Sequence, residues 1–244
     1  MARIFITGSA DGLGQLAARA LIAQGHQVVL HARDEKRGRE ALAGAPGAET
    51  VVTADLSSIR ETIQAADAVN VLGGFDAVIH NAGVYRASAR ELFTINTVAP
   101  YILTCRIQKP KRLVYLSSDM HEGGQPNLES FTTRTNRISY ADTKLHVLLL
   151  CKAVARKWPD VYANALNPGW VPTKMGGRGA PDNLQKGYAT QVWLSASNDE
   201  TAKVSGRYFY HQKETSYNRA ADDVVLQERF LDLCKAVTGV SFPV

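Results

Sequence analysis

The sequence lacks the features that mark membrane-spanning, secreted and repeat proteins. It has 244 residues and contains no run of about 18 apolar residues, the length that a membrane-spanning helix needs. A strand-like apolar stretch at residues 4–6 begins almost at once, which leaves no room for a signal peptide. No internal repeat or low-complexity tract is evident. We therefore expect a cytoplasmic protein without a membrane span.

Cysteine is scarce and is not arranged as a framework. The three cysteines, Cys105, Cys151 and Cys234, lie far apart and show neither metal-ligand spacing nor an even number for disulfides. We expect reduced, buried thiols and no metal site.

The excess of positive charge is small, with a formal net charge of +5. The basic residues form two short clusters that are not interleaved with the aromatic residues on which nucleic-acid bases stack. Solvated surface explains them more simply than a nucleic-acid partner does. The clusters are Arg33, Lys36, Arg37 and Arg39, and Arg106, Lys109, Lys111 and Arg112.

What the chain does contain begins with a glycine-rich turn. An apolar strand at residues 3–7 runs into Gly8, Gly12 and Gly14, and apolar residues then recur at helical spacing. Strand, glycine turn and helix form the context of a dinucleotide site, because glycine lets the backbone approach a pyrophosphate and the helix start offers free N–H groups. A turn that merely connects two elements is the alternative.

The second strand, residues 27–31, ends near Arg33. At this place an acid would bind the free 2′-hydroxyl of NAD, whereas a guanidinium suits the 2′-phosphate of NADP. We therefore favour NADP over NAD. An exposed arginine in a turn is the alternative, and Asp34 can cap the following helix.

Short apolar strands alternate with amphipathic helices along the whole chain. Further strands are expected at residues 49–54, 75–79, 112–116, 162–166 and 207–210. This alternation predicts one α/β domain over residues 1–244, a doubly wound, seven-stranded parallel sheet with helices on both faces in three layers. Ligands of such sheets lie beyond the carboxyl ends of the strands, where Gly8, Arg33, Asp55 and Asn81 stand.

Tyr140 and Lys144 are four residues apart, at the start of a helix that runs on through the apolar residues 145–150. In a helix these positions share one face. A nearby ammonium favours the phenolate and lowers the pKa of a phenol, so Tyr140 would exchange a proton near physiological pH. A solvated lysine beside a half-buried tyrosine is the alternative. Asn96 lies within an apolar helix, and Ser117 and Ser118 end the fifth strand.

Together these residues resemble the short-chain dehydrogenase/reductase family over nearly the whole chain, with its Rossmann-type fold. The long interval from Ser118 to Tyr140 and the aromatic last strand look most like the retinol-dehydrogenase-like subgroup. The family motifs appear in order as Thr7 to Gly14, Asp55-Leu56, Asn81-Ala82-Gly83, Asn96, Ser118, Tyr140 with Lys144, and Pro168-Gly169.

The resemblance implies an NADP-dependent oxidoreductase that transfers a hydride between nicotinamide and a carbonyl or secondary alcohol. We expect the substrate to be a bulky, largely apolar molecule. Tyr140 would donate the proton, Ser118 would hold the carbonyl oxygen, Lys144 would bind the nicotinamide ribose, and Asn96 would fix a water. The implied cofactor-binding residues are Gly8, Asp11, Gly12, Leu13, Gly14, Arg33, Asp55, Leu56, Asn81, Ala82, Gly83, Tyr140, Lys144, Pro168, Gly169, Val171 and Thr173.

Two departures from the family pattern concern the substrate site and assembly. Residues 119–138 lengthen the serine-to-tyrosine interval and are expected to form a loop beside the substrate. Lys109-Pro110 shorten the helix that joins a dimer interface in many relatives. The sequence therefore leaves the formation of a homo-oligomer undecided. A lid is expected at about residues 174–184, and Trp170, Tyr188 and Trp193 line a pocket or belong to the core. A non-catalytic NADP(H) sensor of the same fold is the alternative function.

Overall fold

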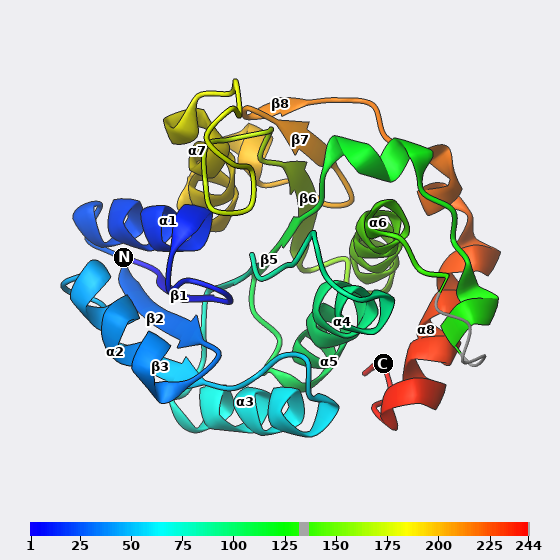
Figure 1. Cartoon of the computed structure of the whole chain (residues 1–244), viewed down its shortest axis with the longest axis horizontal. Coiled ribbons are helices and arrows are strands. Elements are labelled where there is room, and N and C mark those ends of the chain that lie inside the picture. Colours follow the sequence, from blue (N-terminus) through cyan, green and yellow to red (C-terminus); the bar gives the residue numbers. More distant parts are fainter. Residues whose placement is uncertain (132–136, 244) are drawn as a thin grey trace.

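The computed structural model describes residues 1–131 and 137–243. Its centre is one eight-stranded sheet in the order β3-β2-β1-β4-β5-β6-β7-β8 (Figure 1). The first seven strands are parallel, as predicted. They are β1 Arg3–Ile6, β2 Gln27–Ala32, β3 Thr50–Thr53, β4 Ala77–His80, β5 Arg112–Leu116, β6 Tyr162–Asn167 and β7 Tyr208–Tyr210.

The sequence did not predict the eighth strand, β8 Lys213–Glu214, which pairs antiparallel with β7. It returns through a tight turn in which His211 and Gln212 adopt φ values of 48° and 64°. Glycine usually marks such left-handed turns, and the chain has none here. A two-residue strand after a turn without glycine leaves almost no sequence pattern.

Helices cover both faces of the sheet, which confirms the three-layer fold (Figure 1). One face packs against α1 Gly12–Ala23, α2 Glu35–Gly44 and α7 Leu184–Ala196. The other packs against α3 Ile59–Val71, α5 Ala99–Arg106, α6 Tyr140–Lys157 and α8 Val224–Thr238. The strands are apolar on both sides because both sides are covered.

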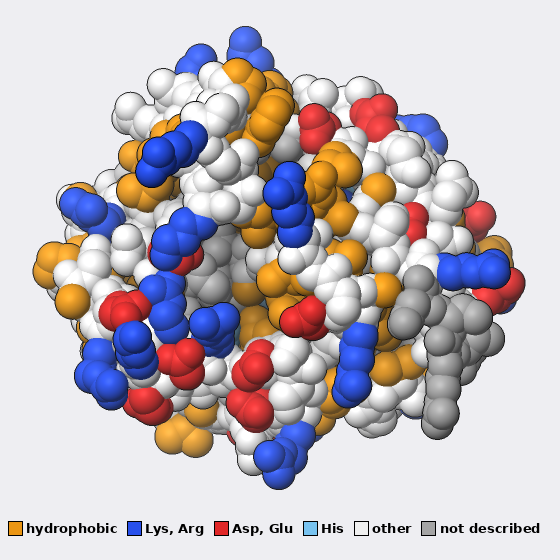
Figure 2. Space-filling model, viewed as in Figure 1, with side chains coloured by type: hydrophobic (Ala, Val, Ile, Leu, Met, Phe, Trp, Pro, Cys, Tyr) orange, Lys and Arg blue, Asp and Glu red, His pale blue; other side chains and the backbone are white. Residues whose placement is uncertain are grey.

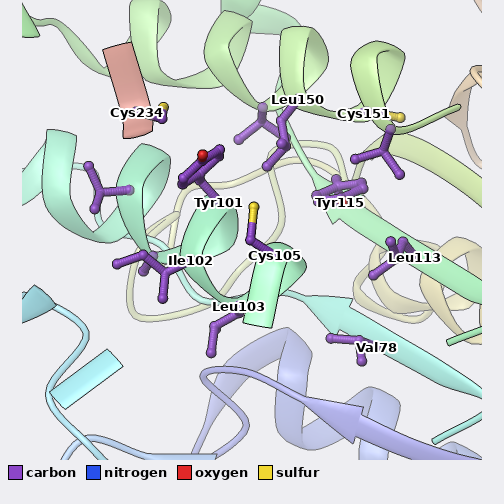
Figure 3. Packing of buried hydrophobic residues seen from close by; sticks show 14 of the residues in the cluster. Val78, Tyr101, Ile102, Leu103, Cys105, Leu113, Tyr115, Leu150, Cys151 and Cys234 are labelled. Carbon is purple, nitrogen blue, oxygen red and sulfur yellow. The ribbon is translucent and has the colours of Figure 1, made fainter. Parts of the chain in front are cut away.

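All three cysteines are free and buried, as expected (Figure 3). They lie in the core between α5, α6 and α8, near the rings of Tyr101 and Tyr115. Burial raises the pKa of Cys105 and of Cys151 to about 12, so both remain thiols at neutral pH. Across residues 1–131 and 137–243, the helices are too short or too polar to cross a bilayer.

Two irregular helices shape the region around Tyr140. A π-helical turn, Thr94–Val98, joins α4 Ala89–Phe93 to α5, and Asn96 lies in it. Such turns often occur at functional sites. The predicted loop at residues 119–138 contains the 3₁₀ turns Asp119–Gly123 and Leu128–Phe131, and its residues 132–136 lie outside the described part of the chain.

Helix α6 begins at Tyr140 because Ser139 caps it. The Ser139 hydroxyl accepts from the backbone N–H of Asp142, and the Asp142 carboxylate accepts from the backbone N–H of Ser139. The same carboxylate also accepts from the N–H of Gln125 and the side chain of Asn127. Through the Asp142 carboxylate, the first turn of α6 is therefore bonded to the segment that precedes the helix.

Candidate active site

A cleft of about 660 Å³ opens at the carboxyl ends of β1, β2, β3, β4 and β5. It lies where the strand order reverses between β1 and β4, which is where doubly wound sheets bind ligands. Figure 2 shows the hollow, with basic and acidic side chains on one side and hydrophobic ones on the other. The predicted residues that line it are Gly8, Asp11, Gly12, Leu13, Arg33, Asp55, Leu56, Asn81, Ala82, Gly83, Tyr140, Lys144, Pro168 and Thr173.

The glycine turn packs tightly against the end of β4. Gly8 and Gly12 have φ values of 62° and 56°, and a Cβ at Gly8 would lie 2.8 Å from the Cα of Ala82. The Asn81 amide donates to the carbonyls of Thr7 and Gly8 at 2.9 Å each. Asn81 therefore holds the turn in the shape that leaves backbone N–H groups facing the cleft.

His31 is a buried support of this turn that the sequence analysis missed. Its Nδ1 accepts from the N–H of Gly8 at 3.0 Å, and its Nε2 lies 3.1 Å from the carbonyl of Ala54. Burial lowers the pKa of His31 to about 4, so the ring is neutral and can accept that bond. The position of His31 in an apolar strand indicates from the sequence that its ring is buried. Its two partners, Gly8 and Ala54, follow β1 and β3, so the sequence alone does not indicate these hydrogen bonds.

Three cations gather around the Asp11 carboxylate at one end of the cleft. Arg37, on α2, bonds to the Asp11 carboxylate at 2.6 Å, and Lys174 bonds to the same oxygen at 2.8 Å. Burial opposes the charge of Asp11, but the bonds and charges of Lys174 and Arg37 outweigh it and lower the Asp11 pKa. Arg33 stands beside them with its side chain 76% exposed. The sequence analysis predicted Arg33 and Asp11 here but missed Arg37 and Lys174.

Tyr140, Lys144 and Ser118 meet at the other end of the cleft. Lys144 is buried, its ammonium lies 5.3 Å from the centre of the Tyr140 ring, and it donates to the carbonyl of Leu116 at 2.9 Å. The Ser118 side chain lies within reach of the Tyr140 phenol, and its interaction lowers the pKa of that phenol against the larger rise caused by burial. The i, i+4 spacing thus brings the two side chains together on one face of α6, as predicted.

The expected effect of Lys144 on Tyr140 is absent from the described structure. Burial raises the pKa of Tyr140 to about 12, and the hydrogen bond from Ser118 only partly opposes it. Lys144 lies over the ring rather than at the hydroxyl, and burial lowers its own pKa to about 8. At neutral pH the phenol is therefore protonated and the ammonium charged.

The side chains of Ser117 and Ser118 point to opposite sides, as successive residues of an extended segment do. Ser117 is buried, and its hydroxyl donates to the carbonyl of Lys144 at 2.8 Å, which fastens α6 to β5. The hydroxyl of Ser118 contacts Tyr140 and also donates to the Asp119 carboxylate at 3.0 Å. The hydroxyl of Ser118 is thus the one beside the phenol.

Asn96 lies next to this group but its amide is occupied by protein. Its Oδ1 accepts from the N–H of Val84 at 2.9 Å, and its Nδ2 donates to the Val84 carbonyl and the Thr143 hydroxyl. A Cβ at Gly83 would lie 3.3 Å from Asn96 Oδ1 and 3.5 Å from Lys144 Nζ. Asn96 therefore fixes the loop after β4 close to the ammonium.

The remaining predicted residues lie outside the cleft lining. In the described chain, the lining does not include Gly14, Asn96, Ser118, Gly169 or Val171. A Cβ at Gly14 would lie 2.4 Å from the Asn81 amide nitrogen, and Val171 is buried against Gly187 of α7. Tyr188 and Trp193 pack against the core cluster, so their pocket role is wrong and the core alternative holds.

The expected lid follows β6 and reaches the cleft through Thr173, Lys174 and Met175. Trp170 fixes its shape, since its indole N–H donates to the carbonyl of Gly176 at 2.8 Å and its backbone N–H to Asp182 at 2.7 Å. In Figure 1 this segment lies above the start of α7, on the same side as the glycine turn before α1.

Comparison with known proteins agrees with the geometry. The family model for short chain dehydrogenase matches residues 2–183. The chain therefore belongs to the short-chain dehydrogenase/reductase family, whose members are NAD(P)-dependent oxidoreductases, and it is an enzyme of that class.

Relatives cover the chain from end to end. An uncharacterized oxidoreductase of Emericella nidulans is 45% identical over all of this chain and 99% of its own length, and the short-chain dehydrogenase chyC of Penicillium rubens is 37% identical over all of both. A crystal structure of an uncharacterized protein from Mycobacterium paratuberculosis superposes with a TM-score of 0.84 at 24% identity, covering 100% of this chain and 96% of that one.

The retinol-dehydrogenase-like subgroup is a more distant relation than the sequence motifs predicted. Mouse retinol dehydrogenase 14 is 25% identical over 97% of this chain and 86% of its own. The fungal short-chain dehydrogenases are nearer in sequence.

Proposed function

We propose that this enzyme is an NADPH-dependent reductase of bulky, apolar carbonyl compounds. The observation that carries the proposal is the pairing of a protonated phenol with a buried ammonium at one end of a cleft whose other end is lined by three cations. The glycine turn and the start of α1 line the same cleft and offer the tight turn and helix start that a dinucleotide binds.

The cationic end supports NADP over NAD. Arg33 and Arg37 project from the end of β2 and the first turns of α2, where the adenosine ribose lies in this fold. Their planar donors match a 2′-phosphate. Asp11 already binds Arg37 and Lys174, so its charge is balanced before a phosphate arrives.

Bound NADPH would supply the hydride, and the protein would supply position and a proton. Tyr140 would donate its phenolic proton to the oxygen of the carbonyl as that oxygen gains charge. Ser118, beside the phenol, would turn its hydroxyl from the Asp119 carboxylate to donate a hydrogen bond to the same oxygen. Lys144 would hold the ribose hydroxyls, and Thr173 would orient the carboxamide.

The ionisation states favour reduction over oxidation. An acid with a pKa of about 12 holds its proton at pH near 7, ready to be given to an alkoxide. Oxidation of an alcohol would begin from the phenolate, which burial disfavours here. Reduction is therefore the direction for which the free enzyme is prepared.

The rim of the catalytic end supports an apolar substrate. The Tyr85 ring lies edge-on to the Tyr140 ring at 4.8 Å, and Met175 lines the same cleft. Met120, two residues after Ser118, and Trp170, at the base of the lid, are also large and exposed. Solvent-exposed apolar side chains gathered from three loops are typical of a binding rim.

A panel of carbonyl compounds tests this proposal. We expect purified enzyme to oxidise NADPH in the presence of aromatic ketones and quinones, with weak activity on small polar ketones. NADPH binding without turnover of any member would overturn the reductase proposal and favour a sensor, which fluorescence titration of NADPH would reveal.

A further inference from the structure

The serine of the site is held from outside the sheet. Strand β5 ends at Leu116, and Ser118 lies beyond it, 22 positions before Tyr140. The chain turns at once into the 3₁₀ turn Asp119–Gly123. Ser118 therefore belongs neither to the ladder of β5 nor to helix α6, and its backbone position depends on the contacts of this turn.

His121 folds back onto Ser118 from within this turn. Its ring Nδ1 and its backbone N–H both donate to the carbonyl of Ser118, the latter at 3.2 Å. The Nδ1 to carbonyl contact is short. One peptide oxygen of the serine is thus held by two donors of the same residue.

The opposite side of the ring is anchored in the C-terminal segment. Nε2 of His121 accepts from the backbone N–H of Asn218 at 3.2 Å. The Asn218 side chain in turn donates to the carbonyls of His121, Glu122 and Gly124 at 3.3 to 3.4 Å. Each ring nitrogen has one partner, which requires the neutral Nδ1–H tautomer. Burial lowers the pKa of His121, in keeping with a neutral ring.

The surroundings leave the ring little freedom. His121 is fully buried, and the ring of Tyr208 on β7 packs edge-on against it at 4.8 Å. A Cβ at Gly124 would lie 2.5 Å from the carbonyl of Ala141, so the turn sits directly on the first turn of α6. The same small unit therefore touches Ser118 at one end and the residue after Tyr140 at the other.

We propose that His121 is a positioning residue for carbonyl reduction. With Asn218 it forms a clasp that fastens Ser118 to the C-terminal segment and keeps the serine hydroxyl within reach of the Tyr140 phenol and the substrate oxygen. This inference rests on the proposed reductase function. Without the ring, the Ser118 carbonyl loses a bond and the serine loses its link to Asn218. A misplaced donor then costs turnover rather than cofactor binding.

Three replacements of His121 separate the two halves of the clasp. His121→Leu removes both ring bonds. His121→Asn places an amide where Nδ1 stood and can still donate to Ser118, whereas His121→Gln places its amide nearer the position of Nε2. His26→Leu is the matched control, because His26 also binds a backbone N–H, that of Ala2, but at the distant start of β1.

The readouts are kcat and KM with phenanthrenequinone and NADPH, the Kd of NADPH from fluorescence, and the melting temperature. We expect His121→Leu and His121→Gln to lower kcat by roughly 10- to 100-fold, with the Kd of NADPH changed less than about twofold. His121→Asn should recover kcat to within about fivefold of the wild type. His26→Leu should lower the melting temperature at unchanged kcat.

Equal kcat in all folded variants, with losses confined to melting temperature, would overturn the inference, as would a His121→Asn variant no better than His121→Gln. Hydrogen exchange of the NADPH complex gives a readout that is independent of turnover. His121→Gln should speed exchange in residues 117–124 and 215–222 but not in the glycine turn. If the wild type reduces no carbonyl while this exchange pattern holds, the reductase function fails and the clasp stands; unchanged exchange would remove the clasp.

Discussion

The two ends of the cleft are built in opposite ways. At the cationic end, Asp11, Arg33, Arg37 and Lys174 are partly exposed and held by ion pairs. At the end that holds Tyr140 and Lys144, Lys144 is buried, Tyr140 is half-buried, and hydrogen bonds to backbone carbonyls fix their surroundings. Interactions between exposed charges are screened by salt, so substitution of one of these residues disturbs the structure little. The interactions of buried polar side chains depend strongly on the exact positions of those side chains. Substitutions at the first end should alter cofactor choice, and those at the second should alter turnover.

The largest expected effect is that of Tyr140→Phe. The change removes the hydroxyl that we propose as the proton donor and leaves the ring packed against Tyr85. We expect kcat to fall by roughly 10²- to 10⁴-fold. The Kd of NADPH, measured by fluorescence, should stay nearly unchanged. A variant that keeps more than a few per cent of activity would remove Tyr140 from the role of acid.

The next effect should appear at the other end, with Arg33→Asp. A carboxylate at this place repels a 2′-phosphate and can accept from the 2′-hydroxyl of NADH. We expect the ratio of kcat/KM for NADPH to that for NADH to fall by about 10- to 100-fold, with kcat for either cofactor little changed.

Arg39→Asp is the matched control for this substitution. Arg39 is an exposed arginine on the same helix, α2, and among the described residues the cleft lining does not include it. The two variants have the same net charge. An equal shift in both would show that overall charge rather than a 2′-phosphate site sets the preference.

The pH dependence of kcat/KM should follow the ionisation of the Lys144 ammonium. Burial lowers its pKa to about 8, so the ammonium is charged below that pH and becomes neutral above it. Since kcat/KM reports ionisations of the free enzyme, it should be level below about pH 8 and then fall by up to tenfold per unit. Lys144→Arg keeps its charge and should lack the fall. A profile of the wild type that is level to about pH 10 would contradict this assignment.

The smallest effect concerns the rim. Tyr85→Ala removes a ring that packs edge-on against Tyr140 and leaves the side chains of Tyr140, Ser118 and Lys144 in the sequence. We expect KM for an aromatic ketone to rise about fivefold and KM for NADPH to stay constant. Val71→Ala, a truncation of an exposed residue on α3, is the control. A fivefold rise for small polar ketones as well would point to loss of site structure rather than of an apolar contact.

The sequence predicted those parts of the molecule that local patterns encode. The seven parallel strands, the glycine turn and the Tyr140–Lys144 pair follow from periodicity, glycine placement and helical spacing. Each depends on residues that are close in the chain. The fold and the ends of its strands could therefore be assigned before any coordinates.

The parts that it did not predict depend on residues far apart. Lys174 reaches Asp11 across 163 positions, and Asn218 reaches His121 across 97. The raised pKa of Tyr140 depends on burial by neighbouring loops, which no spacing rule contains. Asn96 is assigned to protein partners because the π-helical turn aims it at Val84 and Thr143.

The central claim is that the catalytic end directs a hydride from NADPH to a carbonyl carbon that Tyr140 protonates at oxygen. Its most direct test uses NADPH labelled with deuterium at nicotinamide C4, on the transferred face, and mass spectrometry of the secondary alcohol formed from an aromatic ketone such as acetophenone. The account predicts one carbon-bound deuterium in the reduced product with wild-type enzyme and almost none of that product with Tyr140→Phe. Deuterium transfer at an equal rate in both, or NADPH consumption without labelled product, would contradict it.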